Sequence, residues 1–350
     1  MTHEAVTRTV PRSTPHKRAT MADVAALAGV GLKTVSRYVN GETNIAPDIS
    51  ARIGEAISAL NFRRNFAAAS IRPGRHSELI ALIIEDIANP FYSALTGAIE
   101  NALRDEGFVL IVASSEEDTA RHTQLVEQFL ERRVDGLIIV PPRDPGPQWV
   151  RLADEIPALV LLDRPDPQVT ADTIVADDRA GGRLATELLL EGGSRRIAFV
   201  GESLDLVSVA ARHRGYQDAL RAAGLTPDPA LRLAGDRSAD AVSRTVHRLL
   251  AADPTIDGLF GSNNRSAVGI LGALRELGEQ RAVVGFDDFE AATLVSPQLT
   301  VVTHDLAEMG RRAADLVLRR IRGDDTEPQH VTLPVTAIRR GSDRIRPQEK

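Results

Sequence analysis

The chain has 350 residues, 43% of them hydrophobic and 26% charged, which is typical of a globular protein with more than one domain. It contains no cysteine, which excludes disulfides, thiolate metal sites and a cysteine nucleophile. No apolar run approaches the roughly 18 residues of a membrane span. Residues 1–19 are polar and basic without an apolar core, so we expect no secretory signal and a cytoplasmic location.

Charge is distributed unevenly along the chain. Residues 1–76 hold 11 Lys and Arg against 5 Asp and Glu, whereas residues 77–350 hold 31 against 43. A basic head on an acidic body is typical of a protein whose head meets phosphate groups and whose body does not.

The head begins with the pattern of a short capped helix. Thr20 is a suitable N-cap, and Asp23 stands three residues later, where a capping box places an acidic side chain. Apolar residues follow at helical spacing. We expect the buried face of this helix to consist of Val24, Leu27 and Ala28.

Two further helices are expected after this one. The Gly29–Gly31 segment predicts a turn, and residues 32–39 predict a second helix that packs against the first through Val35 and Val39. A third helix opens at Ala46-Pro47, because proline favours a first helical turn. Its expected apolar stripe is Ile49, Ile53, Ile57 and Leu60.

The start of the second helix carries side chains that donate hydrogen bonds to base edges and phosphates. Two helices joined by a glycine-containing turn, in the basic part of the chain, favour a DNA-binding helix-turn-helix over a plain three-helix bundle. The side chains concerned are Lys33, Thr34, Ser36 and Arg37.

Residues 23–40 read D-V-A-x-x-A-G-V-G-x-x-T-V-S-R-x-x-N. This run resembles the signature of the LacI-type repressor family, in which Ser usually stands at the position of Gly31. The resemblance extends over roughly Thr20 to Ser342. It implies that Leu32, Lys33 and Arg37 read bases, and that Thr20, Thr34, Ser36, Asn40 and Asn65 hold phosphates.

A short alanine-rich stretch at residues 65–75 ends in Pro73 and Gly74. Such a segment is marginal as an isolated helix. The family resemblance implies a hinge helix that forms on DNA and inserts an apolar side chain, here Ile71 in place of the usual Leu, into the minor groove. A plain interdomain linker is the alternative.

From Leu79 onward, short apolar runs alternate with amphipathic segments. This alternation predicts parallel α/β sheets, and the number of units predicts two lobes. Ligands in such folds bind beyond the carboxyl ends of the strands. The expected strands are 79–84, 109–113, 136–140, 158–162, 197–201, 258–261 and 282–286, and the expected helices include 91–106, 119–132 and 181–191.

Polar and aromatic side chains follow several of these strands. Carboxylates, amides and guanidinium groups beside an aromatic ring suit a polyhydroxylated ligand, because each hydroxyl both donates and accepts. Singly, each of these residues could instead be a helix cap, a turn residue or part of the core. The set is similar to the pocket of periplasmic sugar-binding proteins, to which LacI-type bodies are related, and implies Asn89, Phe91, Tyr92, Asp163, Arg164, Arg212, Asn263, Asp287 and His304 as effector-binding residues.

Three departures from that pattern affect the choice of ligand. His304 stands where Gln is common, Asn264 replaces a frequent Asp, and the turn at 278–282 is shortened. A nucleoside, a sugar phosphate or another metabolite therefore remains an alternative to a sugar.

Signatures of catalysis are missing from the sequence. It has no G-x-S-x-G elbow, no P-loop and no H-E-x-x-H, and its 8 His show no metal-like spacing. We expect no enzyme activity, no cofactor and no metal. A binding protein for transport would require a signal peptide and no head. A sugar-processing enzyme would require paired acid and base carboxylates, which the sequence does not exclude and which an assay for turnover would test.

The expected architecture is an all-α helix-turn-helix head plus an α/β body of two Rossmann-like lobes, the type I periplasmic-binding-protein fold. The tail has no leucine heptads, so we expect a homodimer that binds a palindromic operator and a small-molecule effector. The expected segments are a disordered basic arm at 1–19, a DNA-binding domain at 20–64, a hinge helix and linker at 65–76, an effector-binding and dimerisation domain at 77–342 and a polar tail at 343–350.

Overall fold

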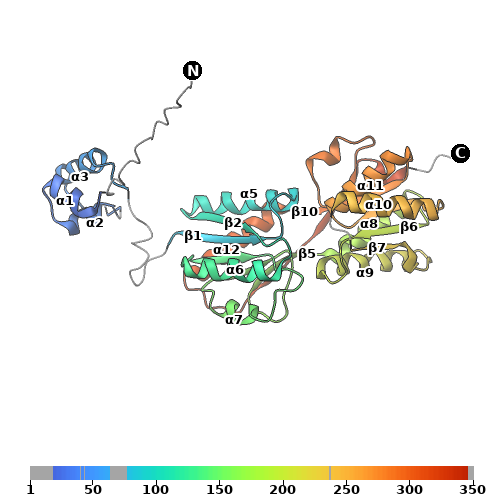
Figure 1. Cartoon of the computed structure of the whole chain (residues 1–350), viewed down its shortest axis with the longest axis horizontal. Helices are drawn as coiled ribbons and strands as arrows, with labels where there is room; N and C mark the ends of the chain where they lie inside the picture. Colours follow the sequence, from blue (N-terminus) through green and yellow to red (C-terminus); the bar gives the residue numbers. More distant parts are fainter. Residues whose placement is uncertain (1–18, 40, 43, 64–76, 236–237, 346–350) are drawn as a thin grey trace, which may run out of the picture. The chain divides into compact units, whose positions relative to one another are not determined.

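The structure is a computed structural model that describes residues 19–39, 41–42, 44–63, 77–235 and 238–345. The chain divides into two compact units, residues 1–75 and 76–350, here called the head and the body (Figure 1). Three residues with expected roles, Asn40, Asn65 and Ile71, lie outside the described residues, as does the expected hinge segment.

The head contains three helices, α1 (Met21–Ala28), α2 (Leu32–Val39) and α3 (Pro47–Ala59). The capping box predicted at Thr20 is present, because its hydroxyl accepts from the Asp23 backbone N–H at 3.3 Å and Asp23 accepts from the Thr20 N–H at 2.8 Å. Gly29 ends α1 with a left-handed φ of 63°, which a glycine adopts without strain.

The core of the head differs from the prediction at one residue. Val24 and Val35 are buried as predicted, together with Ile53 of α3, but Leu27 is 56% exposed. The prediction for Leu27 was wrong because, at about 100° per residue, Ala28 and Ala25 lie on one side of Val24 and define the buried arc, whereas Leu27 lies on the opposite side of Val24, outside that arc.

The first lobe of the body is a six-stranded parallel sheet in the order β11-β5-β4-β3-β1-β2. Side chains alternate between its two faces, so that Ile80 and Leu82 pack with α5 and α12, whereas Ala81 and Ile83 pack with α6 and α7. The elements are β1 (Leu79–Ile84), α5 (Pro90–Asp105), β2 (Val109–Ser114), α6 (Thr119–Glu131), β3 (Gly136–Ile139), α7 (Trp149–Asp154), β4 (Leu159–Leu162), β5 (Asp172–Ala176), α12 (Leu306–Ile321) and β11 (His330–Leu333).

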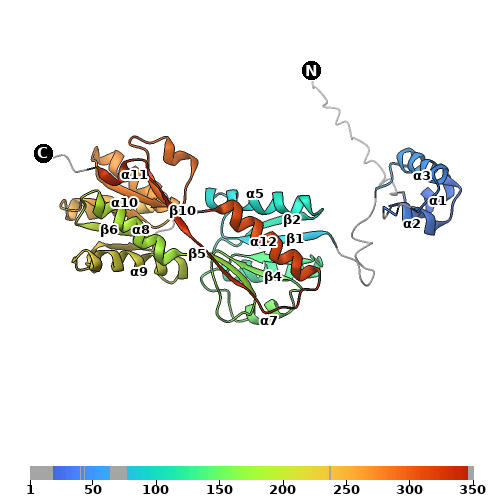
Figure 2. The ribbon, with the colours of Figure 1, turned by 180° about the vertical axis from the view of Figure 1, so that it is seen from behind.

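The second lobe is also a six-stranded sheet, in the order β12-β10-β9-β8-β6-β7. Helices α8 and α9 cover one face, and α10 and α11 cover the other (Figure 2). The elements are α8 (Asp178–Glu191), β6 (Ile197–Gly201), α9 (Val207–Ala222), β7 (Arg232–Ala234), α10 (Ala239–Ala252), β8 (Gly258–Gly261), α11 (Asn264–Leu277), β9 (Ala282–Phe286), β10 (Thr300–His304) and β12 (Val335–Ile338), with short 3-10 helices at Pro229–Leu231, Glu290–Thr293 and Ser342–Arg344.

The chain passes between the lobes three times, after β5, after β10 and between β11 and β12. The last passage explains the one departure from the parallel sheets expected from the sequence. Only Pro334 separates β11 from β12, so the chain enters the second sheet without turning back and β12 pairs antiparallel with β10. Among the described residues, no helix is both long enough and apolar enough to cross a membrane.

Candidate DNA-contacting helix and ligand cleft

Helix α2 presents the side chains that the sequence associates with DNA. Val35 is buried in the head, whereas Leu32 and Lys33 at the start of the helix are exposed. Thr34, Ser36 and Arg37 are half-buried. The helix therefore packs through Val35, with Tyr38 and Val39 partly buried against the same core as predicted for Val39, and leaves a mixed apolar, cationic and hydroxyl surface at its N-terminal end. Such a surface suits contact with base edges and phosphates.

Arg37 is already held by other residues of the head. Its Nε donates to the Glu42 carboxylate at 2.6 Å, and Nη2 donates to the Asn44 carbonyl oxygen at 2.9 Å. A guanidinium group has five N–H donors in a rigid plane, and Nη1 has no partner among the described residues, so that edge has donors to offer a base. Glu42 thus fixes the orientation in which Arg37 would meet DNA.

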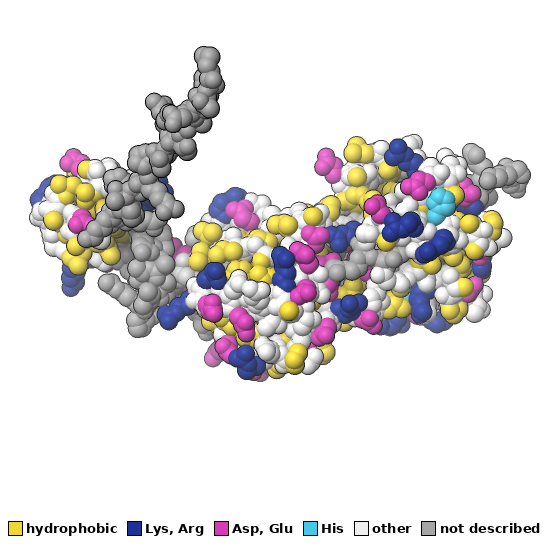
Figure 3. Space-filling model, viewed as in Figure 1, with side chains coloured by type: hydrophobic (Ala, Val, Ile, Leu, Met, Phe, Trp, Pro, Cys, Tyr) yellow, Lys and Arg dark blue, Asp and Glu magenta, His cyan; other side chains and the backbone are white. Residues whose placement is uncertain are grey.

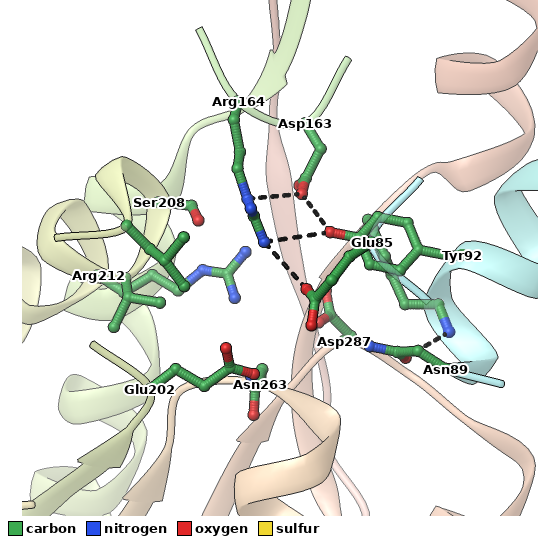
Figure 4. Close-up of a pocket in the computed structure, with 13 residues that line it drawn as sticks. Glu85, Asn89, Tyr92, Asp163, Arg164, Glu202, Ser208, Arg212, Asn263 and Asp287 are labelled. Atoms are coloured by element: carbon green, nitrogen blue, oxygen red, sulfur yellow. Dashed lines mark hydrogen bonds and ion pairs between the residues drawn. The ribbon is translucent and has the colours of Figure 1, made fainter. Parts of the chain in front are cut away.

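A cleft lies between the two lobes of the body (Figure 4). The space between the lining residues is about 390 Å³, a volume that includes open solvent at its mouth. Eight of the nine residues expected to bind an effector line it, and His304 does not. The lining consists of Glu85, Asn89, Phe91, Tyr92, Asp163, Arg164, Glu202, Leu206, Ser208, Val209, Arg212, Asn263 and Asp287.

Asp163 and Asp287 occupy equivalent places in the two lobes. Each directly follows a central strand, β4 or β9, and each has a φ of 66°. A left-handed backbone at a residue other than glycine is uncommon, and such strain concentrates at functional sites. In both lobes this turn brings the carboxyl group to the cleft.

Arg164 is the centre of the first lobe's contribution. It forms ion pairs with Glu85, at 3.1 Å, and with Glu117. Tyr92 donates its hydroxyl to Asp163 at 3.1 Å and lies 3.4 Å from Arg164 Nη2. This network neutralises the buried guanidinium and fixes it at the cleft wall.

Arg212 is the matching cation of the second lobe. Its Nε donates to Asp178 at 2.7 Å, its Nη1 donates to the Ser262 carbonyl oxygen at 2.6 Å, and the group lies 3.6 Å from the centre of the Phe286 ring. Helices α8 and α9 meet here through a glycine, because a Cβ atom at Gly182 would come within 2.0 Å of the Arg212 carbonyl oxygen.

Asp287 is the least satisfied polar group in the cleft wall. Its Oδ1 is buried and accepts no hydrogen bond from the described residues. Burial raises the pKa of this carboxyl to about 7, with the cation of Arg212 acting against the rise and the carboxylates of Asp163 and Asp178 adding to it. An acceptor of this kind is ready for a ligand that brings its own donors.

The two asparagines of the cleft have structural partners as well. Asn89 caps α5 by accepting from the Phe91 N–H at 3.1 Å. Asn263 caps α11 through Ser266 and donates to Glu202 at 2.9 Å. The sequence left open whether such residues were caps or ligand contacts, and these two combine a capping role with a place in the lining.

Five lining residues were missed from the sequence. Glu85 directly follows β1 and Glu202 directly follows β6, so the strand-end rule that selected Asp163 and Asp287 also pointed to them. The remaining three come from the start of α9, where no strand-end signal exists, and are Leu206, Ser208 and Val209.

His304 ends β10 behind the cleft wall. Its ring centre lies 5.8 Å from that of Phe91, and neither ring nitrogen has a hydrogen-bond partner among the described residues. Burial, with the nearby cation of Arg212, lowers the pKa of His304 to about 4. The imidazole is therefore neutral at neutral pH and supports the aromatic side of the cleft.

The charge of the cleft lining is unbalanced. It holds four carboxyl groups and two guanidinium groups. Hydroxyl-rich neutral ligands suit such a lining, because they can donate to carboxylates and accept from guanidinium groups. Within the described residues, no group of three or more His, Asp or Glu is arranged to hold a metal ion.

Two family models match the chain. Residues 20–65 match "Bacterial regulatory proteins, lacI family", and residues 77–340 match "Periplasmic binding proteins and sugar binding domain of LacI family". The ribose operon repressor of Escherichia coli K12 is 30% identical over 330 residues, covering 93% of this chain and 99% of that protein. The regulator CelR of Thermobifida fusca is 34% identical over 331 residues, covering 91% and 96%.

Solved structures of transcriptional regulators are also similar to this chain. The complex of CelR with cellobiose has a TM-score of 0.70 and 32% identity, covering 93% of this chain and all of that one. The Lac repressor dimer bound to operator and an anti-inducer has a TM-score of 0.81 and 25% identity, covering 93% and 99%. Together with the helix-turn-helix head and the two-lobed body of the type I periplasmic-binding-protein fold, these matches show that the chain belongs to the LacI family of bacterial transcriptional regulators.

Proposed function

We propose that this regulator is a repressor that binds a palindromic operator as a homodimer and responds to a small polyhydroxylated ligand, a sugar or sugar derivative, held between the lobes of its body. The observation that carries the ligand class is the buried carboxyl group of Asp287, whose Oδ1 has no hydrogen-bond partner among the described residues, in a cleft lined by acceptors and donors from both lobes and by two aromatic rings. A sugar supplies the hydroxyl donors that Asp287 lacks and the C–H face that an aromatic ring covers.

The charge of the cleft also favours a neutral sugar over a sugar phosphate. With carboxyl groups outnumbering guanidinium groups by four to two, a phosphate ester would meet net repulsion in a partly desolvated site. A neutral sugar is therefore favoured over a sugar phosphate. A nucleoside is the second candidate, because Phe91 and Tyr92 form an edge-to-face aromatic pair with ring centres 4.9 Å apart beside the same polar groups.

The proposed effector-binding residues are those of the cleft lining, with Asp287 and Asp163 accepting from ligand hydroxyls and Arg164 and Arg212 donating to ligand oxygens. His304 contributes behind the wall. In the head, we propose that Leu32, Lys33 and Arg37 read bases, that Ile71 wedges into the minor groove, and that phosphates are held by Thr20, Thr34, Ser36, Asn40 and Asn65.

The proposed segment boundaries are those stated for the sequence, with the hinge at 65–76. Sensing requires no chemistry on the ligand, so we assign the protein no enzyme activity, and its DNA partner places it in the cytoplasm. A ligand that contacts both lobes favours one arrangement of the body, and the operator favours one arrangement of the hinge. The ligand changes operator affinity because these two arrangements are coupled.

The test is a thermal-shift screen of the full chain against matched sets of a neutral sugar, its amino sugar, its phosphate ester and nucleosides. A ligand at 100 times its dissociation constant adds about 2.7 kcal/mol to the free energy of unfolding. We expect stabilisation by a neutral sugar, its loss in Asp287→Asn, and its retention in the control Asp315→Asn on the exposed side of α12.

The sugar that stabilises the full chain is then tested in an operator-binding assay. The operator for this assay is selected from a random DNA pool. Release of the full chain from that operator by the sugar supports the proposal. Stabilisation by phosphate esters alone, or a sugar that binds without any effect on operator affinity, contradicts it.

A further inference from the structure

Two side chains at the start of α11 reach from the second lobe to the first. Asn264 Nδ2 donates to Asn89 Oδ1 at 2.7 Å, and Arg265 forms ion pairs with Glu85, at 3.4 Å, and with Asp86. Their partners lie 175 to 180 positions earlier in the chain, in the segment between β1 and α5. We call these five residues the interlobe clasp.

The first lobe holds its side of the clasp in a fixed geometry. Asp86 uses Oδ1 to accept from the Ala88 N–H at 2.8 Å and presents Oδ2 to Arg265. Asn89 Oδ1 is positioned by the cap of α5. These acceptors are therefore oriented before the second lobe meets them, which lowers the entropy cost of the contact.

The clasp is connected directly to the ligand cleft. Glu85 lines the cleft and accepts from Arg164 Nη2 at 3.1 Å through Oε2, while its Oε1 faces Arg265. One carboxylate thus bridges a guanidinium group of each lobe. Removal of Arg265 would leave Glu85 to Arg164 and its other first-lobe contacts, and would remove two of the ion pairs that join the lobes.

We infer that Arg265 is a positioning residue that, through the interlobe clasp, holds the two lobes together around the cleft in the absence of ligand and fixes Glu85 against Arg164. A ligand that must contact both lobes then meets a cleft that is already assembled. Its apparent affinity is higher in proportion to the population of that assembled state.

The experiment measures the distance between the lobes in the ligand-free full chain. Because the chain has no cysteine, Glu127→Cys on α6 and Arg244→Cys on α10 provide two unique sites for nitroxide labels at exposed positions. Double electron–electron resonance on labelled protein diluted with unlabelled protein gives the distance distribution within one chain. We expect Arg265→Gln to lower the ratio of assembled to separated lobes about fivefold, the effect of losing roughly 1 kcal/mol.

Matched variants separate the clasp from a general loss of charge or stability. Arg312→Gln breaks an exposed ion pair with Glu308 inside one lobe and should leave the distribution unchanged. Asp86→Asn should reproduce part of the effect of Arg265→Gln, because Arg265 keeps its ion pair with Glu85. Adding Asp86→Asn to Arg265→Gln should change little, because the contact that it removes is already lost. The exchange Arg265→Asp with Asp86→Arg re-forms one ion pair without the pair to Glu85, so it should recover part of the assembled population.

A distribution that is the same in wild type, Arg265→Gln and Asp86→Asn would overturn the inference, as would strictly additive effects of the two substitutions. If Arg265→Gln alone fails to fold, Asp86→Asn and the charge exchange still decide the question. The measurement uses neither ligand nor DNA, so its failure is distinguishable from failure of the proposed function.

Discussion

At the scale of single residues, the two cations that line the cleft also form ion pairs that hold the fold together. Arg212 is buried against Asp178, whose pKa burial raises to about 6 in spite of the opposing guanidinium cation. A carboxyl group in this position depends on its partner, because a buried ion that loses its partner keeps its desolvation cost.

We therefore expect Arg212→Ala to lower the free energy of unfolding by about 3–5 kcal/mol. Urea denaturation monitored by circular dichroism measures this. The double variant Arg212→Met with Asp178→Asn, which removes both charges, should recover a large part of the loss. Equal stability of Arg212→Ala and wild type would show that the ion pair contributes nothing.

The pKa of Asp287 predicts how the affinity for the ligand depends on pH. Its pKa of about 7 means that roughly half of the ligand-free protein carries a proton there at pH 7. A sugar hydroxyl donates more strongly to the carboxylate than to the acid, so binding should favour deprotonation. Affinity should therefore fall about tenfold between pH 8 and pH 6.

Calorimetry at both pH values, in buffers of different ionisation enthalpy, measures the affinity and the released proton together. Asp287→Asn should bind more weakly and lose the pH dependence. Affinity that instead rises toward pH 6 would mean that the ligand accepts from a protonated Asp287.

Glu42 has two opposing effects on DNA binding. It orients Arg37, and it places a negative charge beside a DNA-contacting helix. Glu42→Gln should raise affinity for random DNA about two- to fivefold by removing repulsion, and should weaken discrimination at the base pair that Arg37 reads. Titrations on the selected operator and its single-base variants test this. Glu55→Gln on α3 removes the same charge and should leave discrimination intact.

At the scale of elements, the contact between α8 and α9 sets the position of Arg212. This contact depends on paired glycines, since a Cβ atom at Gly182 or at Gly215 would lie 2.0 Å from a backbone oxygen of the facing helix. Backbone atoms cannot rotate away as a side chain does, so a larger residue must push the helices apart.

Gly182→Ala should therefore destabilise the body by about 1–3 kcal/mol and weaken ligand binding by displacing α9. Gly97 on α5 is the matched control, because a Cβ atom there has no neighbour within 4 Å. Gly97→Ala should instead stabilise the helix by about 0.5–1 kcal/mol. Thermal denaturation and ligand titration of both variants compare these outcomes, and similar behaviour of the two would refute the packing argument.

At the scale of the whole molecule, the distribution of charge distinguishes DNA binding by the head from ligand binding by the body. The face of the body seen in Figure 3 carries Lys and Arg interspersed with Asp and Glu, whereas the first 76 residues carry an excess of basic residues. DNA binding should therefore involve counterion release and ligand binding should not.

With six or more phosphates neutralised per dimer, operator affinity should fall about a thousandfold between 50 and 200 mM salt, while sugar affinity stays nearly constant. Fluorescence anisotropy over a salt series gives the first quantity, and calorimetry gives the second. A flat operator affinity would contradict phosphate-anchored binding.

The sequence by itself determined seven of the strands and several of the polar residues at their ends. Strands β1, β6, β8 and β9 occur at the predicted residues. A buried parallel strand is a continuous run of apolar residues, so a short stretch of sequence is enough to identify it. The strand-end rule similarly placed Asp163 and Asp287 in the cleft without knowledge of sheet order. Short strands such as β7, with three residues, gave no such local signal.

Only the tertiary structure decided how the donors and acceptors pair. Arg212 meets Asp178 across 34 positions, and Arg265 meets Glu85 across 180. Such pairs depend on helix packing and on how the chain crosses between the lobes, and neither leaves a periodic pattern in the sequence. For the same reason, the packing decided that Asp287 Oδ1 has no hydrogen-bond partner among the described residues and that His304 is not part of the cleft lining.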